Sequence, residues 1–183
     1  MTEQLLVCTF AAAAFLPCAV WAQSPPPDAS TPELTYPRYE GRYYEIARLP
    51  SFNERNCASD VVTTFIRRTD GDVSFVNQCV ANATQRIVDI GRIDREASDP
   101  KSGVFRFRPD QIGFTPWYWG TYRLVELADD YSYMAFGSAD KAKLWILART
   151  RRMNDDTYAR LIARAREQGY DVSRLVRSPQ NGA

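Results

Sequence analysis

Apolar and polar residues alternate with a period of two along much of the chain after residue 40, as in β-strands that bury one face. Strands are predicted at eight places bounded by turn-forming residues: 43–48, 61–66, 73–77, 86–94, 104–108, 122–127, 133–137 and 144–149. Asp70-Gly71 predicts a tight hairpin between the second and third of them. Eight short antiparallel strands with short connections favour an all-β, eight-stranded up-and-down β-barrel, because closure leaves no exposed strand edge. A β-sandwich is the alternative.

One segment, residues 154–168, has helical periodicity. Asn154 is a suitable N-cap and Gly169 a suitable end. The apolar residues on one face are Tyr158, Leu161, Ile162 and Ala165, and the charged residues elsewhere are Arg160, Arg164 and Glu167. We expect this α-helix to pack against the outside of the barrel, with a short strand at 171–176 after it. The barrel domain is predicted to span residues 38–180.

The first 37 residues lack the pattern of a folded domain. An apolar run that ends in Val20-Trp21-Ala22 predicts a signal peptide over residues 1–22, although no lysine or arginine precedes the run. A transmembrane helix would need about 20 apolar residues, and Pro17 interrupts this run. A lipoprotein acylated at Cys18 is a further alternative, but the residues before Cys18 lack the small side chain that processing prefers. Residues 23–37 are rich in proline and predict a disordered linker.

Composition excludes several functional classes. The 183 residues are 45% hydrophobic and 25% charged, as expected for one globular domain. A formal net charge of +1 without a long basic run gives no support for nucleic-acid binding. The chain contains no histidine, which removes the usual general base and the commonest zinc ligand. We therefore expect no metal, no cofactor and no enzymatic activity.

Cys57 and Cys79 are the two cysteines that follow the predicted signal peptide. An even pair in an exported protein predicts a disulfide, whereas two buried thiols would indicate a reducing cytoplasm. A simple hairpin about Asp70-Gly71 places Cys79 opposite a residue near Val62, so the segment around Cys57 would have to fold back to reach it.

Three motifs carry a family resemblance. The segment Gly41-Arg42-Tyr43-Tyr44-Glu45-Ile46-Ala47-Arg48-Leu49-Pro50 resembles the N-terminal signature of the lipocalins, in the form found in bacterial and apolipoprotein D-like members, with Tyr43 where the family usually has tryptophan. Asp130-Tyr131 resembles the second signature, at the turn between the sixth and seventh strands, and Arg149 the third. The resemblance implies that Arg149 lies across the Tyr43 ring at the closed end of the barrel, a structural role.

The same alternation identifies residues that should face the barrel interior. They are Phe65, Phe75, Ile87, Phe105, Phe107, Tyr122, Leu124, Trp145 and Leu147. Residues 104–108 alternate phenylalanine and arginine, so inward-facing arginines would instead indicate an outer-membrane barrel. An eight-stranded barrel can be filled by side chains or hold one small ligand, and the residues alone leave both open. The lipocalin resemblance favours an open cup. The aromatic loop 114–120 either rims its mouth or packs on the barrel.

The resemblance to bacterial lipocalins implies binding, storage or transport of a fatty acid or lysophospholipid in the periplasm, free or attached to the outer membrane. A lipid-modifying enzyme of the isomerase or de-epoxidase type is the alternative, and it would need a free thiol or a carboxylate in the interior; Glu45 and Asp89 are the candidate carboxylates. Arginines outnumber acids between residues 149 and 177, which indicates a solvated helix face or contact with an anionic membrane surface. A monomer or weak dimer is expected.

Overall fold

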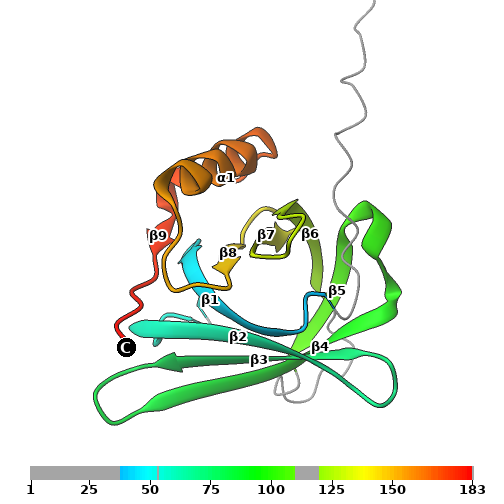
Figure 1. Ribbon diagram of the computed structural model, residues 1–183, viewed down its shortest axis with the longest axis horizontal. Helices are drawn as coiled ribbons and strands as arrows, with labels where there is room; N and C mark the ends of the chain where they lie inside the picture. Colours follow the sequence, from blue (N-terminus) through cyan, green and yellow to red (C-terminus); the bar gives the residue numbers. More distant parts are fainter. Residues whose placement is uncertain (1–37, 53, 110–119, 183) are drawn as a thin grey trace, which may run out of the picture.

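The computed structural model describes residues 38–52, 54–109 and 120–182. The strands are β1 (Gly41–Arg48), β2 (Ser59–Arg67), β3 (Val73–Val80), β4 (Arg86–Asp99), β5 (Val104–Pro109), β6 (Gly120–Leu127), β7 (Tyr133–Ser138), β8 (Leu144–Ala148) and β9 (Val176–Arg177). Each strand from β1 to β7 pairs antiparallel with the next, and β8 pairs with β1, so the sheet closes into a barrel, with β9 added on β1 (Figure 1). The predicted eight-stranded up-and-down barrel is confirmed.

Two predicted boundaries differ from the structure. The fourth strand runs on to Asp99, with a register shift against β5 after Asp94. The strand expected at 171–176 is instead a 3-10 turn, η2 (Val172–Arg174), followed by the two-residue β9. The Asp171 side chain accepts a hydrogen bond from the Ser173 backbone N–H, and this capping bends the chain where an extended segment was expected. A second 3-10 turn, η1 (Pro100–Ser102), precedes β5.

The predicted signal peptide and linker lie outside the described residues, as does the aromatic loop before Gly120. Within the described ranges, no helix is both long and apolar enough to span a membrane.

The helix α1 (Asp155–Glu167) lies outside the barrel, as predicted (Figure 1). Asn154 caps it, because its side-chain oxygen accepts from the backbone N–H groups of Asp156 and Thr157. Leu161 and Ala165 are buried, in a cluster with outward-facing residues of β1, β6, β7 and β8. This cluster fixes the helix to one side of the barrel.

Two arginines of α1, which lie off its apolar face, contact β6 of the barrel. Arg160 pairs with Glu126 of β6 at 3.1 Å, and Arg164 donates to the carbonyl of Val125 at 3.3 Å. The helix lies close enough along β6 for these long side chains to reach past its apolar face.

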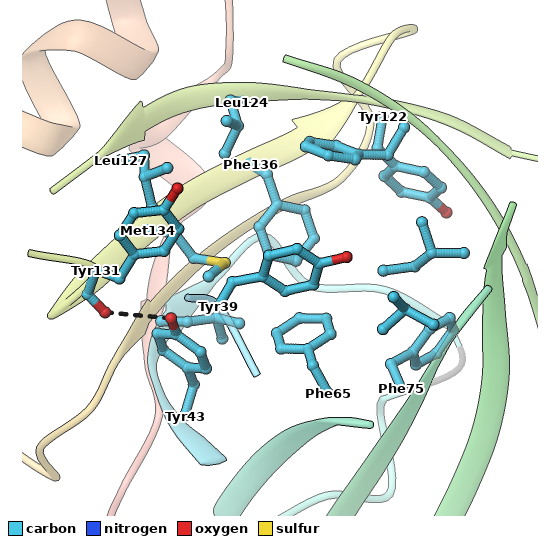
Figure 2. Close-up of a cluster of buried hydrophobic side chains, with 14 residues drawn as sticks. Tyr39, Tyr43, Phe65, Phe75, Tyr122, Leu124, Leu127, Tyr131, Met134 and Phe136 are labelled. Atoms are coloured by element: carbon cyan, nitrogen blue, oxygen red, sulfur yellow. Dashed lines mark hydrogen bonds between the residues drawn. The ribbon is translucent and has the colours of Figure 1, made fainter. Parts of the chain in front are cut away.

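The barrel interior holds the larger cluster of buried residues (Figure 2). It contains aromatic residues from β1, β2, β3, β5, β6 and β7, with Phe107 and Trp145 packed against it. The alternation of residues 104–108 therefore places the phenylalanines inside, since Phe105 belongs to this cluster at 4% exposure. The barrel interior is therefore apolar.

The closed end of the barrel is built on Tyr43 and Arg149. The Arg149 guanidinium lies 3.8 Å from the Tyr43 ring centroid and donates to the carbonyls of Arg42 and Arg38, each at 3.1 Å. Gly41 has φ of 96°, and a Cβ there would meet Arg149 Nη1 at 3.2 Å, so glycine fits both the backbone and the arginine. The arrangement implied by the family resemblance is present.

The C-terminal segment fills a gap in the barrel wall between β1 and β2. These strands pair only from Gly41↔Phe65 to Tyr44↔Val62, and beyond that point they part. Gln180 donates its amide N–H groups to the carbonyls of Glu45 (2.9 Å) and Val61 (3.0 Å), bridging the two strands. The tail thereby satisfies backbone groups that the sheet leaves unpaired.

Candidate ligand cavity

A cavity of about 110 Å³ lies inside the barrel at the end opposite the Tyr43–Arg149 pair. Its apolar wall consists mainly of Phe65, Phe75, Phe107, Tyr122, Phe136 and Leu147. A predominantly apolar hollow with a few polar groups is typical of small-molecule sites. Side chains therefore do not fill the barrel completely at this end.

The aromatic rings of the wall support one another. Phe107 stacks on Tyr122 with centroids 4.6 Å apart and lies 5.3 Å from Phe75. Trp145 contacts Phe136 at 5.4 Å and Tyr122 at 5.8 Å. Such tilted and stacked pairs add to the stabilisation from burial and fix the ring orientations. The rings of the apolar wall therefore hold one another in place.

Gly91 of β4 makes room for one of these rings. A Cβ at this position would lie 2.1 Å from the Phe75 ring, so any side chain there would displace the ring. Glycine inside a strand often marks such a close approach.

The interior residues predicted from alternation divide into two sets. Those that line the cavity are Phe65, Phe75, Ile87, Phe107, Tyr122, Trp145 and Leu147. Phe105 and Leu124 are interior but line a separate void of about 10 Å³ on the closed-end side, which Phe65 shares. Phe65 also contacts Tyr43 and so separates the cavity from the closed end.

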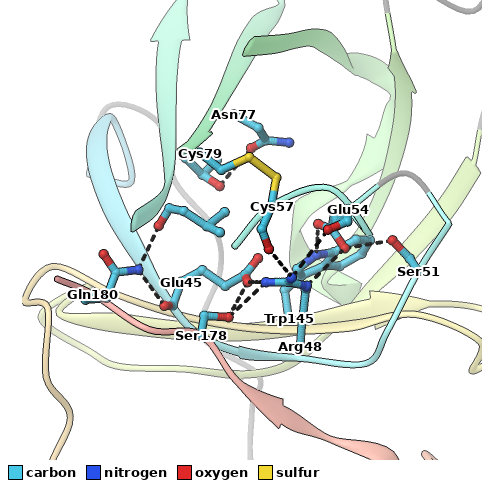
Figure 3. Close-up of polar contacts among 12 residues, drawn as sticks. Glu45, Arg48, Ser51, Glu54, Cys57, Asn77, Cys79, Trp145, Ser178 and Gln180 are labelled. Carbon is cyan, nitrogen blue, oxygen red and sulfur yellow. Dashed lines mark hydrogen bonds and ion pairs between the residues drawn. A yellow bond between two sulfur atoms is a disulfide. The ribbon is translucent and has the colours of Figure 1, made fainter. Parts of the chain in front are cut away.

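A polar cluster occupies one side of the cavity (Figure 3). Arg48 at the end of β1 donates from Nη1 to Glu45 Oε1 at 2.5 Å, and its Nε lies 3.8 Å from Glu54 Oε2. Glu54 also accepts from Trp145 Nε1 at 2.6 Å and from Ser51 Oγ at 2.7 Å. The Arg48 guanidinium therefore contacts both the Glu45 and the Glu54 carboxylates. The hydrogen bond from the Trp145 indole holds the loop that carries Glu54 against the aromatic wall.

Glu45 is buried, at 1% exposure. Its Oε1 accepts from Arg48 and from Ser178 Oγ, which reaches in from the C-terminal segment. Burial raises the pKa of the Glu45 carboxyl above its usual range, the negative charge of Glu54 raises it further, and Arg48 opposes both. This is the carboxylate that alternation places in the interior, two residues after Tyr43.

The predicted disulfide between Cys57 and Cys79 is present, with a Cα–Cα distance of 5.5 Å, and both residues line the cavity. The chain folds back as that bond requires, because Cys57 N–H donates to Glu54 O in a tight turn and Arg48 Nη2 donates to Cys57 O. The register of β2 against β3 also shifts between Ser59 and Val62. The disulfide holds the β1–β2 loop beside the cavity.

Several cavity residues were missed by the sequence analysis: Ser51, Glu54, Val61, Thr63, Asn77, Gln78, Phe136 and Lys143. Lys143 precedes Trp145 by two positions and Phe136 lies in a predicted strand, so alternation could have found both. Glu54 lies in a loop, where no periodic signal exists. Within the described part of the chain, no group of acidic or cysteine side chains could hold a metal ion.

A closed antiparallel barrel with an apolar interior cavity and one external helix defines a class of small-molecule-binding barrel proteins. The family model of the lipocalin-like domain matches residues 34–180. The chain therefore belongs to the lipocalin family, as its three motifs predicted.

Curated relatives and solved structures agree. Temperature-induced lipocalin-1 of Arabidopsis thaliana is 31% identical over 150 residues, which cover 81% of this chain and 80% of that protein. The outer membrane lipoprotein Blc of Escherichia coli strain K12 is 29% identical over 179 residues, covering 94% of this chain and 95% of that protein. Lobster apocrustacyanin A1 has the same fold, with a TM-score of 0.61 at 14% identity over 79% of each chain. The bacterial branch of the resemblance is thus represented among the relatives.

Proposed function

We propose that this protein binds a single-chain hydrophobic ligand in its barrel cavity and stores or carries it without chemistry. The observation that carries the proposal is the cavity itself, walled by mutually supporting rings and edged by polar groups on one side. Burial of an acyl chain is favourable by about 0.8 kcal/mol per methylene, so few polar contacts are needed. A fatty acid or a lysophospholipid has the required shape.

The cell envelope is the proposed location. The relative Blc is an outer membrane lipoprotein in name, and residues 1–22 read as a signal peptide with residues 23–37 as a linker. We propose an exported periplasmic protein, monomeric or weakly dimeric, with an anionic membrane surface as a further contact for the arginine-rich C-terminal region. Attachment through Cys18 is the alternative to a free form.

The enzyme alternative has less support. Cys57 and Cys79 are bonded to each other, so neither thiol is available as a nucleophile. Glu45 and Asp89 do line the cavity, and a carboxylate is the group that lipid isomerisation would use. Products that accumulate beyond one per protein molecule would favour this alternative.

The test is lipid binding by the delipidated protein, followed by tryptophan fluorescence and isothermal titration calorimetry. Trp145 borders the cavity, so a bound acyl chain should change its emission, and Trp145→Phe should remove most of that change. Phe75→Asp should weaken binding by at least about tenfold, because an ionised carboxylate in an apolar wall is costly to desolvate.

Ser74→Asp is the matched control. Ser74 precedes Phe75 on β3, points to the outer face, and lies opposite Arg92 in the sheet. This variant adds the same charge to the same strand and should leave affinity unchanged. Equal loss in both variants, or no binding of any single-chain lipid, would contradict the proposed function.

A further inference from the structure

The carboxylate of Glu45 has one oxygen without a protein partner. Both hydrogen bonds to this group, from Arg48 and Ser178, end on Oε1. Among the residues that the structure describes, none donates a hydrogen bond to Oε2. Glu45 is 1% exposed and lines the cavity, so Oε2 is left to meet a ligand at the cavity wall. A carboxylate oxygen in this position can attract a cationic group of a ligand.

The cluster around Glu45 also has an excess of negative charge. Glu45 and Glu54 both lie against Arg48, so two carboxylates share one guanidinium. The other donors to Glu54, the Trp145 indole and the Ser51 hydroxyl, are neutral. With both carboxylates ionised, the cluster carries one net negative charge in a place largely removed from water. A cation beside it would be attracted more strongly than in solution.

We propose that Glu45, Arg48 and Glu54 form the head-group subsite of the cavity, and that it selects a single-chain amphiphile with an ammonium head over one with a carboxylate head. This inference rests on the proposed function and narrows its ligand class. The ammonium lies against Glu45 Oε2, and the chain extends along Phe75, Phe107 and Phe136. A free fatty acid would place a like charge beside two carboxylates.

Two other charged residues line the cavity, Lys143 and Asp89. Their charges are opposite, so together they leave the excess of the Glu45 cluster unchanged. Lys143 nevertheless defines the rival arrangement, in which its ammonium binds an anionic head. The two arrangements predict opposite head-group preferences.

The experiment compares ligands that share a dodecyl or lauroyl chain and differ in the head: dodecyltrimethylammonium, dodecanoate, the neutral monolauroylglycerol and the zwitterionic lauroyl lysophosphatidylcholine. Calorimetric titrations of the full exported protein, below the micelle concentration at pH 7, give the affinities. The quaternary ammonium should bind at least about tenfold more tightly than dodecanoate, because the two heads differ by two unit charges beside a negatively charged cluster, and at a partly buried site this difference is worth more than about 1.4 kcal/mol. Tight binding of lauroyl lysophosphatidylcholine would show that the subsite accepts the ammonium of a zwitterionic lipid. Weak binding of this lipid would show that the subsite requires a head with a net positive charge.

Charge-neutralising variants locate the preference. Glu45→Gln and Glu54→Gln should each reduce the ammonium-to-carboxylate affinity ratio about tenfold, since each leaves the cluster neutral. Two variants are used because either alone could disturb the fold. Lys143→Gln is the matched control and should preserve or increase the ratio. A preference for dodecanoate that disappears in Lys143→Gln would overturn the inference in favour of the rival.

Lowering the pH supplies a separate readout. Burial and the negative charge of Glu54 raise the pKa of the Glu45 carboxyl, so as the pH falls this carboxyl becomes neutral above the usual range for a glutamate. Affinity for the quaternary ammonium, whose own charge is independent of pH, should fall in that range and should not do so in Glu45→Gln. Monolauroylglycerol separates the two proposals: if it binds while no ammonium preference exists, only the subsite inference fails, and if no ligand binds, the proposed function fails.

Discussion

The closed end allows a stability prediction based on Tyr43. Its side chain is fully buried, its hydroxyl donates to Tyr131 O at 3.1 Å, and Arg149 lies over the ring. Burial raises the Tyr43 pKa to about 12, although Arg149 acts in the opposite direction. Tyr43→Phe keeps the ring and the cation over it and removes only the hydroxyl. The variant should lose about 1–3 kcal/mol near neutral pH, because the Tyr131 carbonyl is left buried without its donor.

The sign of the pH effect follows from linkage. Tyrosine in the unfolded chain ionises near pH 10, whereas folded Tyr43 holds its proton to about pH 12. Between these values the unfolded state binds fewer protons, so stability falls as pH rises. By pH 12 this amounts to about 2 kcal/mol, a loss that Tyr43→Phe cannot undergo.

The assay is urea unfolding of both proteins from pH 8 to pH 12. The stability difference should be largest at pH 8 and should shrink by about 2 kcal/mol at pH 12. Tyr133, Tyr158 and Tyr170 also have raised pKa values, but they are present in both proteins and cancel in the difference. A difference that does not change with pH would refute the assignment of Tyr43 as a buried, protonated donor.

Two further predictions concern other parts of the structure. The exported protein should have no free thiol at Cys57 or Cys79, and reducing the disulfide should lower the free energy of unfolding by about 2–4 kcal/mol. Thiol titration under denaturing conditions tests the first expectation, and urea unfolding tests the second. Two reactive thiols would contradict the disulfide. Leu161→Ala should cost about 2–5 kcal/mol because this side chain is fully buried between α1 and the barrel. Arg166→Ala, exposed on the same helix, should change stability by less than about 0.5 kcal/mol, and equal thermal shifts would contradict the packing.

The barrel could be predicted because its strands and turns are specified by patterns within short stretches of the sequence. Alternation located eight strands, Asp70-Gly71 set the register of β2 against β3, and Asn154 with Gly169 bounded the helix. The wrong strand boundaries lie where a side chain competes with the hydrogen bonds between strands, or where the pairing of two strands is irregular. Asp171 caps a 3-10 turn in place of the expected strand, and the extension of β4 beyond Asp94 contains a register irregularity that alternation cannot show.

The cavity was predictable in part for the same reason. Inward-facing residues of the strands follow from period two, which gives the apolar wall and also Glu45. The polar side depends on contacts between distant residues: Trp145 with Glu54, and Ser178 with Glu45. No pattern in the sequence records such pairs, because loop and tail residues have no fixed direction until the barrel places them.

β1 explains why stability and binding can be separated in this barrel. Tyr43 and Glu45 face the interior from the same strand, yet Tyr43 meets Arg149 at the closed end and Glu45 meets Arg48 beside the cavity. Phe65 lies between the two regions, since it contacts Tyr43 and lines the cavity. β1 also leaves β2 after Tyr44, so the wall at Glu45 is completed by the C-terminal tail rather than by a sheet neighbour. In the proposed function, a wall completed by side-chain hydrogen bonds at Glu45 lets the polar subsite adjust to a ligand, while the Tyr43–Arg149 pair keeps the other end of the barrel closed.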